Sequence, residues 1–343
     1  MRELETLEFK IAGGAAAQTL GLLNAIYVSK KTMRPFRVKY FPHSTGTYWP
    51  FAIGFLLKEG ELADDRAFIK GFAPTSDLPI GKIISDHPLE KDYFSRERLL
   101  KWIRALGIEY FLRKLRREIS VEAHPSRLEE ISRRIKSVSG GYAPLLNNEV
   151  MRELDSRFRV GLNNKSPFAR DSKIREEYAV LHYRIGDKRA NFRHGKDFGG
   201  DGIFDPGCFK KILSKVQLPK SAKLYVVSDE PLVAQNLLRE SGIAAHLFRG
   251  INDIWQDLFH MSQAKILIGS WSQVSQLAAI CVSHNGGYAL LPNSPLSGTR
   301  VHWKIPGTDF FQPRYLKSEH PIYASDFAHS KQNHKEHGLN PSP

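Results

Sequence analysis

The chain has 343 residues, of which 41% are hydrophobic and 25% charged, the proportions of an ordinary globular protein. It contains no run of about 18 apolar residues, as a membrane-spanning helix would need. Its first ten residues, MRELETLEFK, carry acidic side chains where a signal peptide has basic and then apolar ones. These features argue against a membrane-spanning or secreted protein, and we expect a cytoplasmic one.

Basic residues dominate the charge, with 50 Lys and Arg against 36 Asp and Glu, for a net charge of +14. Such a balance favours anionic partners, which include nucleotides, nucleic acid, anionic lipid and charged glycans. We expect no nucleic-acid partner, because aromatic residues do not recur among the basic ones and no zinc finger is visible. The basic amphipathic stretch from Lys101 to Arg134 has two interpretations: a core-packed helix, or peripheral contact with a membrane surface.

The two cysteines, Cys208 and Cys281, lie far apart and have no CxxC or histidine partner at metal-binding spacing. A DxD sequence, which would suggest a metal-bridged diphosphate, is also missing. The sequence therefore predicts neither a disulfide framework nor a metal site, and no cofactor.

The first half of the chain begins with a strand, two glycines and a helix. Gly13 and Gly14 allow close approach of the backbone, and the following helix start offers unpaired N–H groups, so this turn can hold an anion. The alternative interpretation is that the two glycines serve only the tight turn between strand and helix, which needs glycine for steric reasons. The expected elements are a strand at 7–12, a helix at 15–28, a strand at 36–41, a helix at 51–57, loops at 58–88, about two helices within 95–136, a break at 139–144, a helix at 147–158 and a polar domain junction at 161–171.

The strand expected at residues 178–181 ends in a group of charged and polar side chains. His182, Arg184 and Asp187 follow it directly, and Gly186 allows a tight turn. Ligands sit at the carboxyl ends of strands in open α/β sheets, where an arginine can bind a phosphate through two hydrogen bonds. The alternative interpretation is an ordinary strand end with a solvated salt-bridge cluster.

Strands and helices alternate through the remainder of the chain, which predicts a doubly wound, mostly parallel sheet. Polar residues follow three of its strands: Arg184, Asp229, and Ser270 with Ser272. Polar residues at three strand ends are expected if a single nucleotide site lies at the carboxyl ends of the strands of this sheet. The expected elements are a glycine-rich loop at 190–206, helices at 208–216, 231–240, 253–261 and 269–279, strands at 224–230, 246–248, 264–268 and 287–291, and a poorly ordered tail after residue 324.

Taken together, these segments resemble the GDP-fucose-dependent fucosyltransferases of the α1,2, α1,6 and protein O-fucosyltransferase group, and most closely the α1,2-like family. His182 to Asp187 match the HxRxGD-type motif of that group. Gly13, Gly14 and Gln18 look like its GGxGNQ turn, and Arg34-Pro35 is similar to its GRP sequence. Further matches are Val227 to Glu230 (FSDD), Asp257 to Ser262 (DLxLMS) and Ser272 to Ser275 (SxxS). The departures are Ile185 in place of a second arginine and Ala15 to Ala17 in the glycine turn.

The resemblance implies an α/β, GT-B-like fold, with two Rossmann-type domains and a cleft between them. We expect residues 1–170 to form the acceptor-side domain, 171–324 the GDP-binding domain and 325–343 a disordered tail. It further implies an inverting, metal-independent transfer of L-fucose from GDP-fucose to a hydroxyl of a glycan acceptor. Two alternatives stay open, which are transfer from another GDP-sugar and a non-catalytic basic module that binds polyanionic polymer.

The expected site has catalytic and substrate-binding residues. Arg184, helped by His182, stabilises the leaving diphosphate, and Asp187 is the base, with Asp201 and Asp205 as competitors. Asp229 would bind guanine or ribose. The expected substrate-binding residues in full are Gly13, Gly14, Gln18, Ser228, Asp229, Ser272, Gln273 and Ser275.

Overall fold

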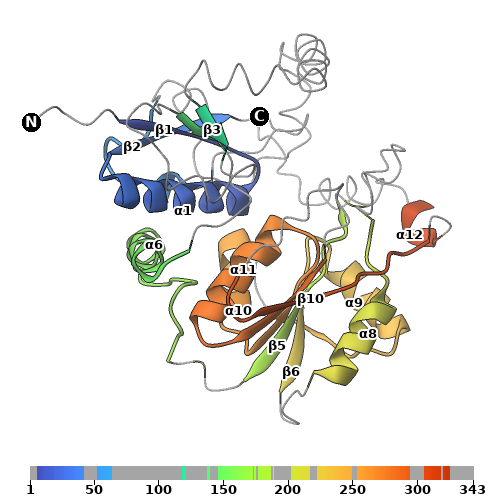
Figure 1. Ribbon diagram of the computed structural model, residues 1–343. Coiled ribbons are helices and arrows are strands. Elements are labelled where there is room, and N and C mark those ends of the chain that lie inside the picture. The colour runs from blue at the N-terminus through green and yellow to red at the C-terminus, as the bar shows by residue number, and fades with distance from the viewer. Residues whose placement is uncertain are drawn as a thin grey trace, which may run out of the picture.

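The computed structural model describes residues 6–41, 52–63, 118–120, 137–139, 146–172, 174, 177–186, 188, 202–216, 222–248, 253–293, 305–317 and 320–324. Within these residues the chain is a mixed α/β protein with two parallel sheets (Figure 1). No helix in this part of the chain is both long and apolar enough to span a bilayer.

The smaller sheet has four parallel strands in the order β2-β1-β4-β3. Its strands are β1 (Leu7–Ala12), β2 (Phe36–Phe41), β3 (Glu118–Ser120) and β4 (Ser137–Ser139). Helix α1 (Ala15–Thr32) packs against one face of it, where a Cβ on Gly21 would lie 2.5 Å from Ile11 Cγ2. Glycine at this position therefore lets the helix approach β1 closely.

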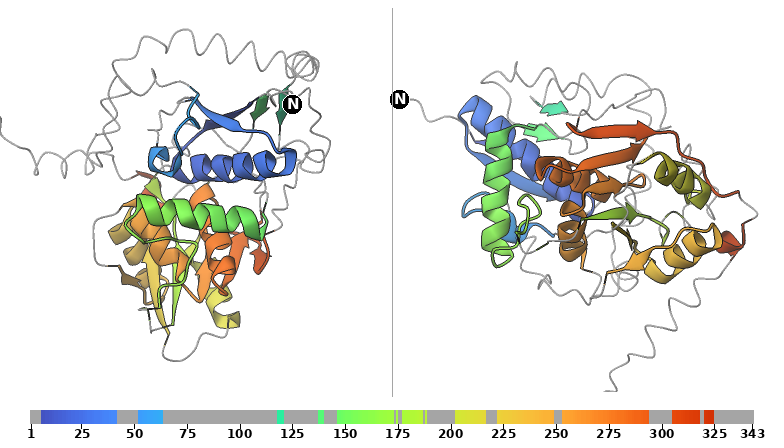
Figure 2. Two further views of the ribbon diagram at one scale, coloured as in Figure 1. Left: turned by 90° about the vertical axis from the view of Figure 1, so that its left-hand side faces the viewer. Right: turned by 90° about the horizontal axis from the view of Figure 1, so that it is seen from below.

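Helix α1 is buried nearly all round, since it lies between its own sheet and the helices of the larger one (Figures 1 and 2). Apolar residues occupy most of its turns, and the polar Gln18, Thr19 and Asn24 are buried with them. It ends at Met33, whose left-handed conformation (φ 56°) closes the helix before the Arg34-Pro35 pair.

The larger sheet has six parallel strands in the order β10-β9-β8-β5-β6-β7. The strands are β5 (Tyr178–His182), β6 (Lys223–Val227), β7 (His246–Leu247), β8 (Ile266–Ile268), β9 (Tyr288–Pro292) and β10 (Thr308–Phe311). Every residue of β5 is buried, as expected for a central strand covered on both faces.

Helices cover both faces of this sheet and bury a separate core on each. On one face, α8 (Pro206–Lys215) and α9 (Pro231–Glu240) pack with Leu181 of β5. On the other, α10 (Ile254–Ser262) and α11 (Gln273–His284) pack with Val180. The chain thus winds in opposite directions from β5, as predicted from the alternating strands and helices.

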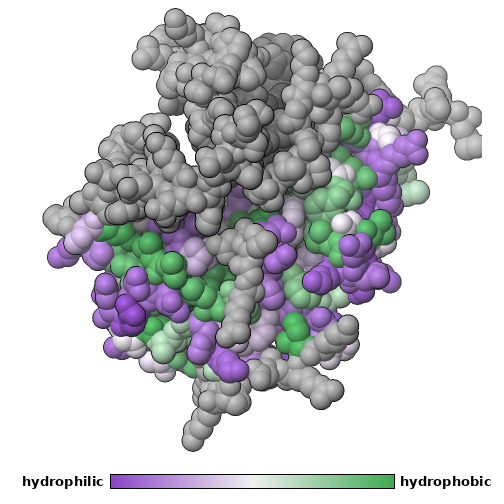
Figure 3. Space-filling view, turned by 180° about the vertical axis from the view of Figure 1, so that it is seen from behind, coloured by the Kyte–Doolittle hydropathy of each residue, from purple (hydrophilic) through white to green (hydrophobic). Residues whose placement is uncertain are grey.

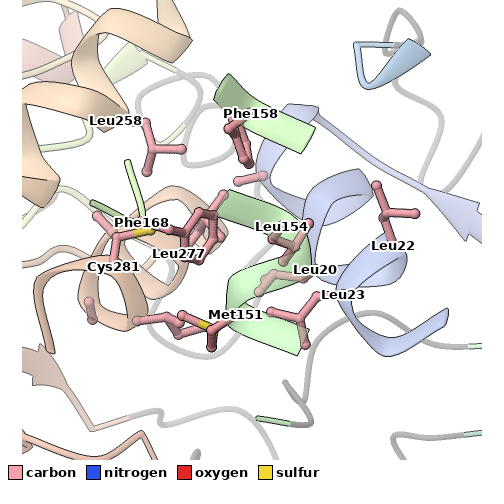
Figure 4. Packing of buried hydrophobic residues seen from close by; sticks show 14 of the residues in the cluster. Leu20, Leu22, Leu23, Met151, Leu154, Phe158, Phe168, Leu258, Leu277 and Cys281 are labelled. Atoms are coloured by element: carbon pink, nitrogen blue, oxygen red, sulfur yellow. The ribbon is translucent and has the colours of Figure 1, made fainter. Parts of the chain in front are cut away.

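Helix α6 (Asn148–Gly161) joins the two halves of the chain, and Asn147 caps it by accepting a hydrogen bond from the N–H of Val150 at 2.8 Å. Its apolar side packs between α1 and the helices of the larger sheet (Figure 4). One core cluster therefore includes residues on both sides of the domain boundary expected between residues 170 and 171. The boundary itself stays a prediction. Members of the cluster from the two halves include Leu20, Leu23, Met151, Leu154, Phe158, Phe168, Leu258, Leu277 and Cys281.

Several expectations from the sequence differ from the structure. Of the helix expected at 51–57, the described residues 52–57 contain only the 3-10 turn η1 (Gly54–Leu56). The Leu56 carbonyl accepts a hydrogen bond from Arg157, and the N–H of Lys58 donates to Glu61, so side chains replace the bonds that would continue a helix. Strands β3, β4 and β10 and the short helix α12 (Pro321–Ala324) were not predicted, since three or four residues are too few to show a period. Most of the stretch at 101–134, the helices expected within 95–136 and the tail at 325–343 lie outside the described residues.

The exposed large hydrophobic side chains of the described residues are spread over different elements. Met33 follows α1, Val160 ends α6, Leu232 begins α9 and Phe310 lies in β10. In the view from behind, hydrophobic and hydrophilic residues alternate over the described surface (Figure 3). Scattered residues of this kind are normal for a protein surface and do not by themselves indicate a docking site.

Candidate functional site

The order of the larger sheet reverses at β5, which makes the carboxyl end of this strand a topological switch point. From β5 the chain moves through α8 to β6 on one side, and it returns through α10 to β8 on the other. The two connections leave on opposite faces, and sheets of this topology bind their ligands beyond the carboxyl ends of the strands at the switch point, here β5 and β8. His182 ends β5, and Ser270, Ser272 and Ser275 follow β8.

His182 is buried and bonded to the start of α11. Its Nδ1 lies 2.6 Å from Ser275 Oγ and 3.5 Å from Ser272 Oγ. Ser272 caps α11 by accepting a hydrogen bond from the N–H of Ser275 at 3.0 Å. Ser275 is fully buried and contacts the histidine, and its predicted place around the phosphates stays a prediction.

Main-chain contacts hold the residues that follow β5. The N–H of Arg184 donates to Ser270 Oγ at 3.2 Å, which fixes the backbone of the arginine beside the turn after β8. The N–H groups of Ile185 and Gly186 donate to the two carboxylate oxygens of Asp229, at 2.8 and 3.1 Å. Asp229 thereby shapes the turn that presents Arg184, whose side chain is partly exposed.

The role predicted for Asp229, binding guanine or ribose, stays a prediction, and the structure adds this positioning role. Ser228 supports the same turn, because its Oγ accepts a hydrogen bond from the N–H of Glu230 at 3.1 Å and donates to Asp229 at 3.4 Å. Ser228 is buried and contacts the acidic side chain, and its predicted substrate-binding role stays a prediction.

The glycine turn of the smaller sheet reaches the same region. A Cβ on Gly13 (φ +85°) would lie 3.8 Å from Gln273 Oε1, at the first residue of α11. Two segments from opposite ends of the chain, both predicted to bind the donor, therefore meet. Gln18 is fully buried, donates to the Gly13 carbonyl at 2.7 Å and accepts from the N–H of Ala52 at 2.8 Å, so it shapes the turn.

The expected bases fall into two groups. Asp187 and Asp201 lie outside the described residues, so the role of Asp187 stays a prediction. Asp205 caps α8, since its carboxylate accepts a hydrogen bond from the N–H of Gly207 at 2.8 Å. A carboxylate used as a helix cap is poorly placed to take a proton from an acceptor, which weakens Asp205 as a competitor.

Asp257 is an ionisable residue near the carboxyl ends of the strands of the larger sheet, and the sequence analysis assigned it no role. It lies in the first turn of α10, which leads into β8 and so begins at the carboxyl edge. Burial, with a further contribution from the nearby Asp253, raises the pKa of Asp257 to about 6. The DLxLMS resemblance was the signal that could have singled it out. Among the described residues, no group of three or more His, Cys, Asp or Glu is arranged to hold a metal ion.

No protein-family model and no curated protein matches the chain. Among solved structures, fucosyltransferase NodZ from Bradyrhizobium is 14% identical, with 82% of this chain and 94% of NodZ covered at a TM-score of 0.39. Fucosyltransferase NodZ is thus a structure that this chain resembles. POFUT1 in complex with GDP-fucose is 13% identical, with 92% of this chain and 99% of POFUT1 covered at a TM-score of 0.37.

NodZ is described as an alpha-1,6-fucosyltransferase, and one of its crystal structures was soaked with GDP-fucose. Similarity to NodZ and POFUT1 at TM-scores below 0.5 does not assign substrates or residue roles to this chain. The function proposed below therefore depends on the chain's own residues.

Proposed function

We propose that this chain is an inverting glycosyltransferase that transfers L-fucose from GDP-fucose to a hydroxyl of a glycan acceptor without a metal ion. The observation that carries the proposal is the group of residues at the switch point beside β5. Counted from β5 as strand 1, the sheet has the order 3-2-1-4-5-6 of Rossmann-type nucleotide-binding domains. His182, Arg184 and the serines after β8 occupy the place where that fold binds its ligand.

The positive charge of Arg184 and of two helix N-termini beside the end of β5 suits a diphosphate. Arg184 would stabilise the negative charge that builds up on the leaving GDP, as a planar, permanently charged group can. Helices α1 and α11 carry no acidic residue in their first turns, and Gly13 and Gln273 bring the two helix starts together. Their partial positive ends add to the same field.

The reaction exchanges one bond at the anomeric carbon for another and transfers one proton. The acceptor oxygen bonds to the anomeric carbon from the face opposite the diphosphate, the bond to GDP breaks, and GDP leaves with the electron pair. A base must take the proton of the acceptor hydroxyl, and we assign this role to Asp187. A second Rossmann-type domain within residues 1–170, a GT-B-like cleft facing the acceptor, a cytoplasmic location and peripheral membrane contact belong to the same proposal.

Replacement of Arg184 tests the catalytic assignment. Arg184→Ala removes charge stabilisation made mainly in the transition state, so we expect kcat to fall about 100- to 1000-fold with the melting temperature unchanged. GDP release from GDP-fucose in the presence of acceptor glycans measures it. Arg159→Ala, on the exposed side of α6, is the matched control and should keep full activity. Near-normal transfer by the Arg184 variant would show that the assignment is wrong.

A ligand panel tests the donor. GDP and GDP-fucose should raise the melting temperature of the purified protein, whereas UDP should not, because only a ligand of the folded state stabilises it. A larger shift with GDP-mannose than with GDP-fucose would favour another GDP-sugar. No shift with any guanine nucleotide, together with salt-dependent binding of polyanions, would contradict the enzyme and favour the binding module.

A further inference from the structure

Gln276, in the first turn of α11, is fully buried, and neither polar atom of its amide has a hydrogen-bond partner among the described residues. The other buried glutamines of the described chain are bonded. Gln18 bonds to the glycine turn, and Gln263 accepts from the N–H of Asp171 at 2.7 Å and donates to the Ala169 carbonyl at 2.9 Å. Exchanging the oxygen and nitrogen of the Gln276 amide would leave both atoms unbonded, so the observation does not depend on that assignment.

A buried amide of this kind indicates a partner other than the described protein groups. Burial removes the hydrogen bonds that Oε1 and Nε2 of Gln276 would make with water, which is unfavourable unless others replace them. The buried polar atoms of native proteins are nearly all bonded, to protein or to ordered water. The partner of this amide is therefore either a buried water molecule or a ligand.

The position of Gln276 favours the ligand. Residues three apart in an α-helix lie about 60° apart around its axis, so Gln276 and Gln273 share one side of α11. Gln273 faces the glycine turn, because its Oε1 would lie 3.8 Å from a Cβ on Gly13. Side chains of a helix lean towards its N-terminus, which brings the amide of Gln276 towards the level of Ser272. The amide thus lies beside the helix start to which the proposed function assigns the diphosphate.

The two kinds of polar atom in the amide select the ligand group. Nε2 needs an acceptor and Oε1 needs a donor, and a hydroxyl group is both, whereas a diphosphate at neutral pH only accepts. A pyrophosphate bound at a helix N-terminus places the groups on either side of it near the first turn. In GDP-fucose these groups are the ribose and the fucose, and the guanine lies one group further away.

We infer that Gln276 is a ligand-binding residue that bonds to a hydroxyl of the ribose or the fucose beside the diphosphate. The inference rests on the proposed function, and it assigns a residue that the sequence analysis left without a role. The amide is enclosed in this structure, so it meets the ligand by turning about the bonds of its long side chain. The hydroxyl then supplies both the acceptor and the donor that the amide needs.

Replacing the amide with a thioether of similar length tests this role. Gln276→Met should raise the melting temperature by about 2 °C, because it removes a buried polar group that no described residue bonds. The same variant should bind GDP-fucose about tenfold more weakly in isothermal titration calorimetry. An equal loss with GDP assigns the ribose hydroxyl, and a loss confined to GDP-fucose assigns the fucose.

Gln263→Met is the matched control. It removes a buried amide that is fully bonded, at the end of α10 that leads away from the proposed site. The control variant should therefore melt below the wild-type protein and bind both nucleotides with unchanged affinity.

Unchanged affinity of Gln276→Met for both nucleotides would overturn the inference, and a lower melting temperature with it would identify a buried water as the partner. If this variant does not fold, a crystal structure of the wild-type protein with GDP-fucose decides the question. The Gln276 amide must then bond to a ribose or fucose hydroxyl, and an amide bonded only to water or phosphate would also overturn the inference. Failure of the wild-type protein to bind either nucleotide would instead contradict the proposed function.

Discussion

Asp257 is a largely buried carboxyl group whose pKa lies at about 6, because burial and then the charge of Asp253 disfavour its ionised form. The same side chain in the unfolded chain has a pKa near 3.8. Between these values the folded protein binds a proton that the unfolded chain has released. The contribution of Asp257 to stability therefore falls as pH rises from about 4 to 6 and stays low above that range.

Asp257→Asn should remove this dependence. At pH 7.5 we expect the variant to melt about 2–4 °C above the wild-type protein, and the difference should vanish towards pH 4, where the carboxyl is protonated in both states. Thermal unfolding of both proteins between pH 4 and 8 measures it. A variant that melts lower than wild type at every pH would mean that the ionised carboxylate has a stabilising partner.

At the scale of residues, the structure adds contacts within the protein to roles that stay predictions. His182 and Ser275 were both assigned to the ligand, and in this structure they also contact each other. Asp229 was assigned to the nucleotide, and its carboxylate accepts hydrogen bonds from the N–H groups of Ile185 and Gly186. A motif names the residues near a site, but which of them face the ligand depends on side-chain directions that only the packed structure fixes.

At the scale of elements, Arg157 of α6 forms hydrogen bonds with the segment at residues 52–63. Its guanidinium donates to Glu61 Oε1 at 2.7 Å, to Glu153 Oε1 at 3.0 Å and to the Leu56 carbonyl at 2.8 Å, and it is almost fully buried. Burial acts to raise the pKa of Glu153, but hydrogen bonds and charges from Lys58 and Arg157 outweigh it and lower that pKa. The ion pairs therefore weaken as pH falls through the titration of Glu153.

Arg157→Met should destabilise the protein by about 3 kcal/mol, since it leaves Glu61 charged and largely buried without its partner. Adding Glu61→Gln to that variant removes the unpaired charge and should restore part of the stability. Urea unfolding of the two single variants, the double variant and wild type gives the coupling energy. Additive effects would show that the pair contributes nothing beyond its separate side chains.

At the scale of the whole molecule, the core around α6 joins the two halves of the chain. Because Phe158 of α6 packs against Trp255 of α10, and α1 packs against α11, unfolding either half exposes apolar surface of the other. Such coupling favours a single cooperative transition over separate melting of residues 1–170 and 171–324.

Calorimetry should therefore show one unfolding transition for the wild-type protein. Phe158→Ala should lower the free energy of unfolding by about 3–5 kcal/mol, because the cavity lies in the shared core. The variant should still unfold in a single transition. Leu232→Ala, on the exposed start of α9, is the control and should leave the free energy of unfolding unchanged. Two transitions, of which only the lower responds to Phe158→Ala, would indicate independently folding domains.

The sequence by itself determined the alternation of strands and helices, the strand ends that carry polar residues and the glycine turn, because these depend on local periodicity and turn chemistry. It did not predict the short strands β3, β4 and β10, which exist only because neighbouring strands supply their hydrogen bonds. Only the tertiary structure placed Gly13 against Gln273 and His182 against Ser275. Contacts between residues so far apart in sequence depend on the order in which strands pair, and no local pattern encodes that order.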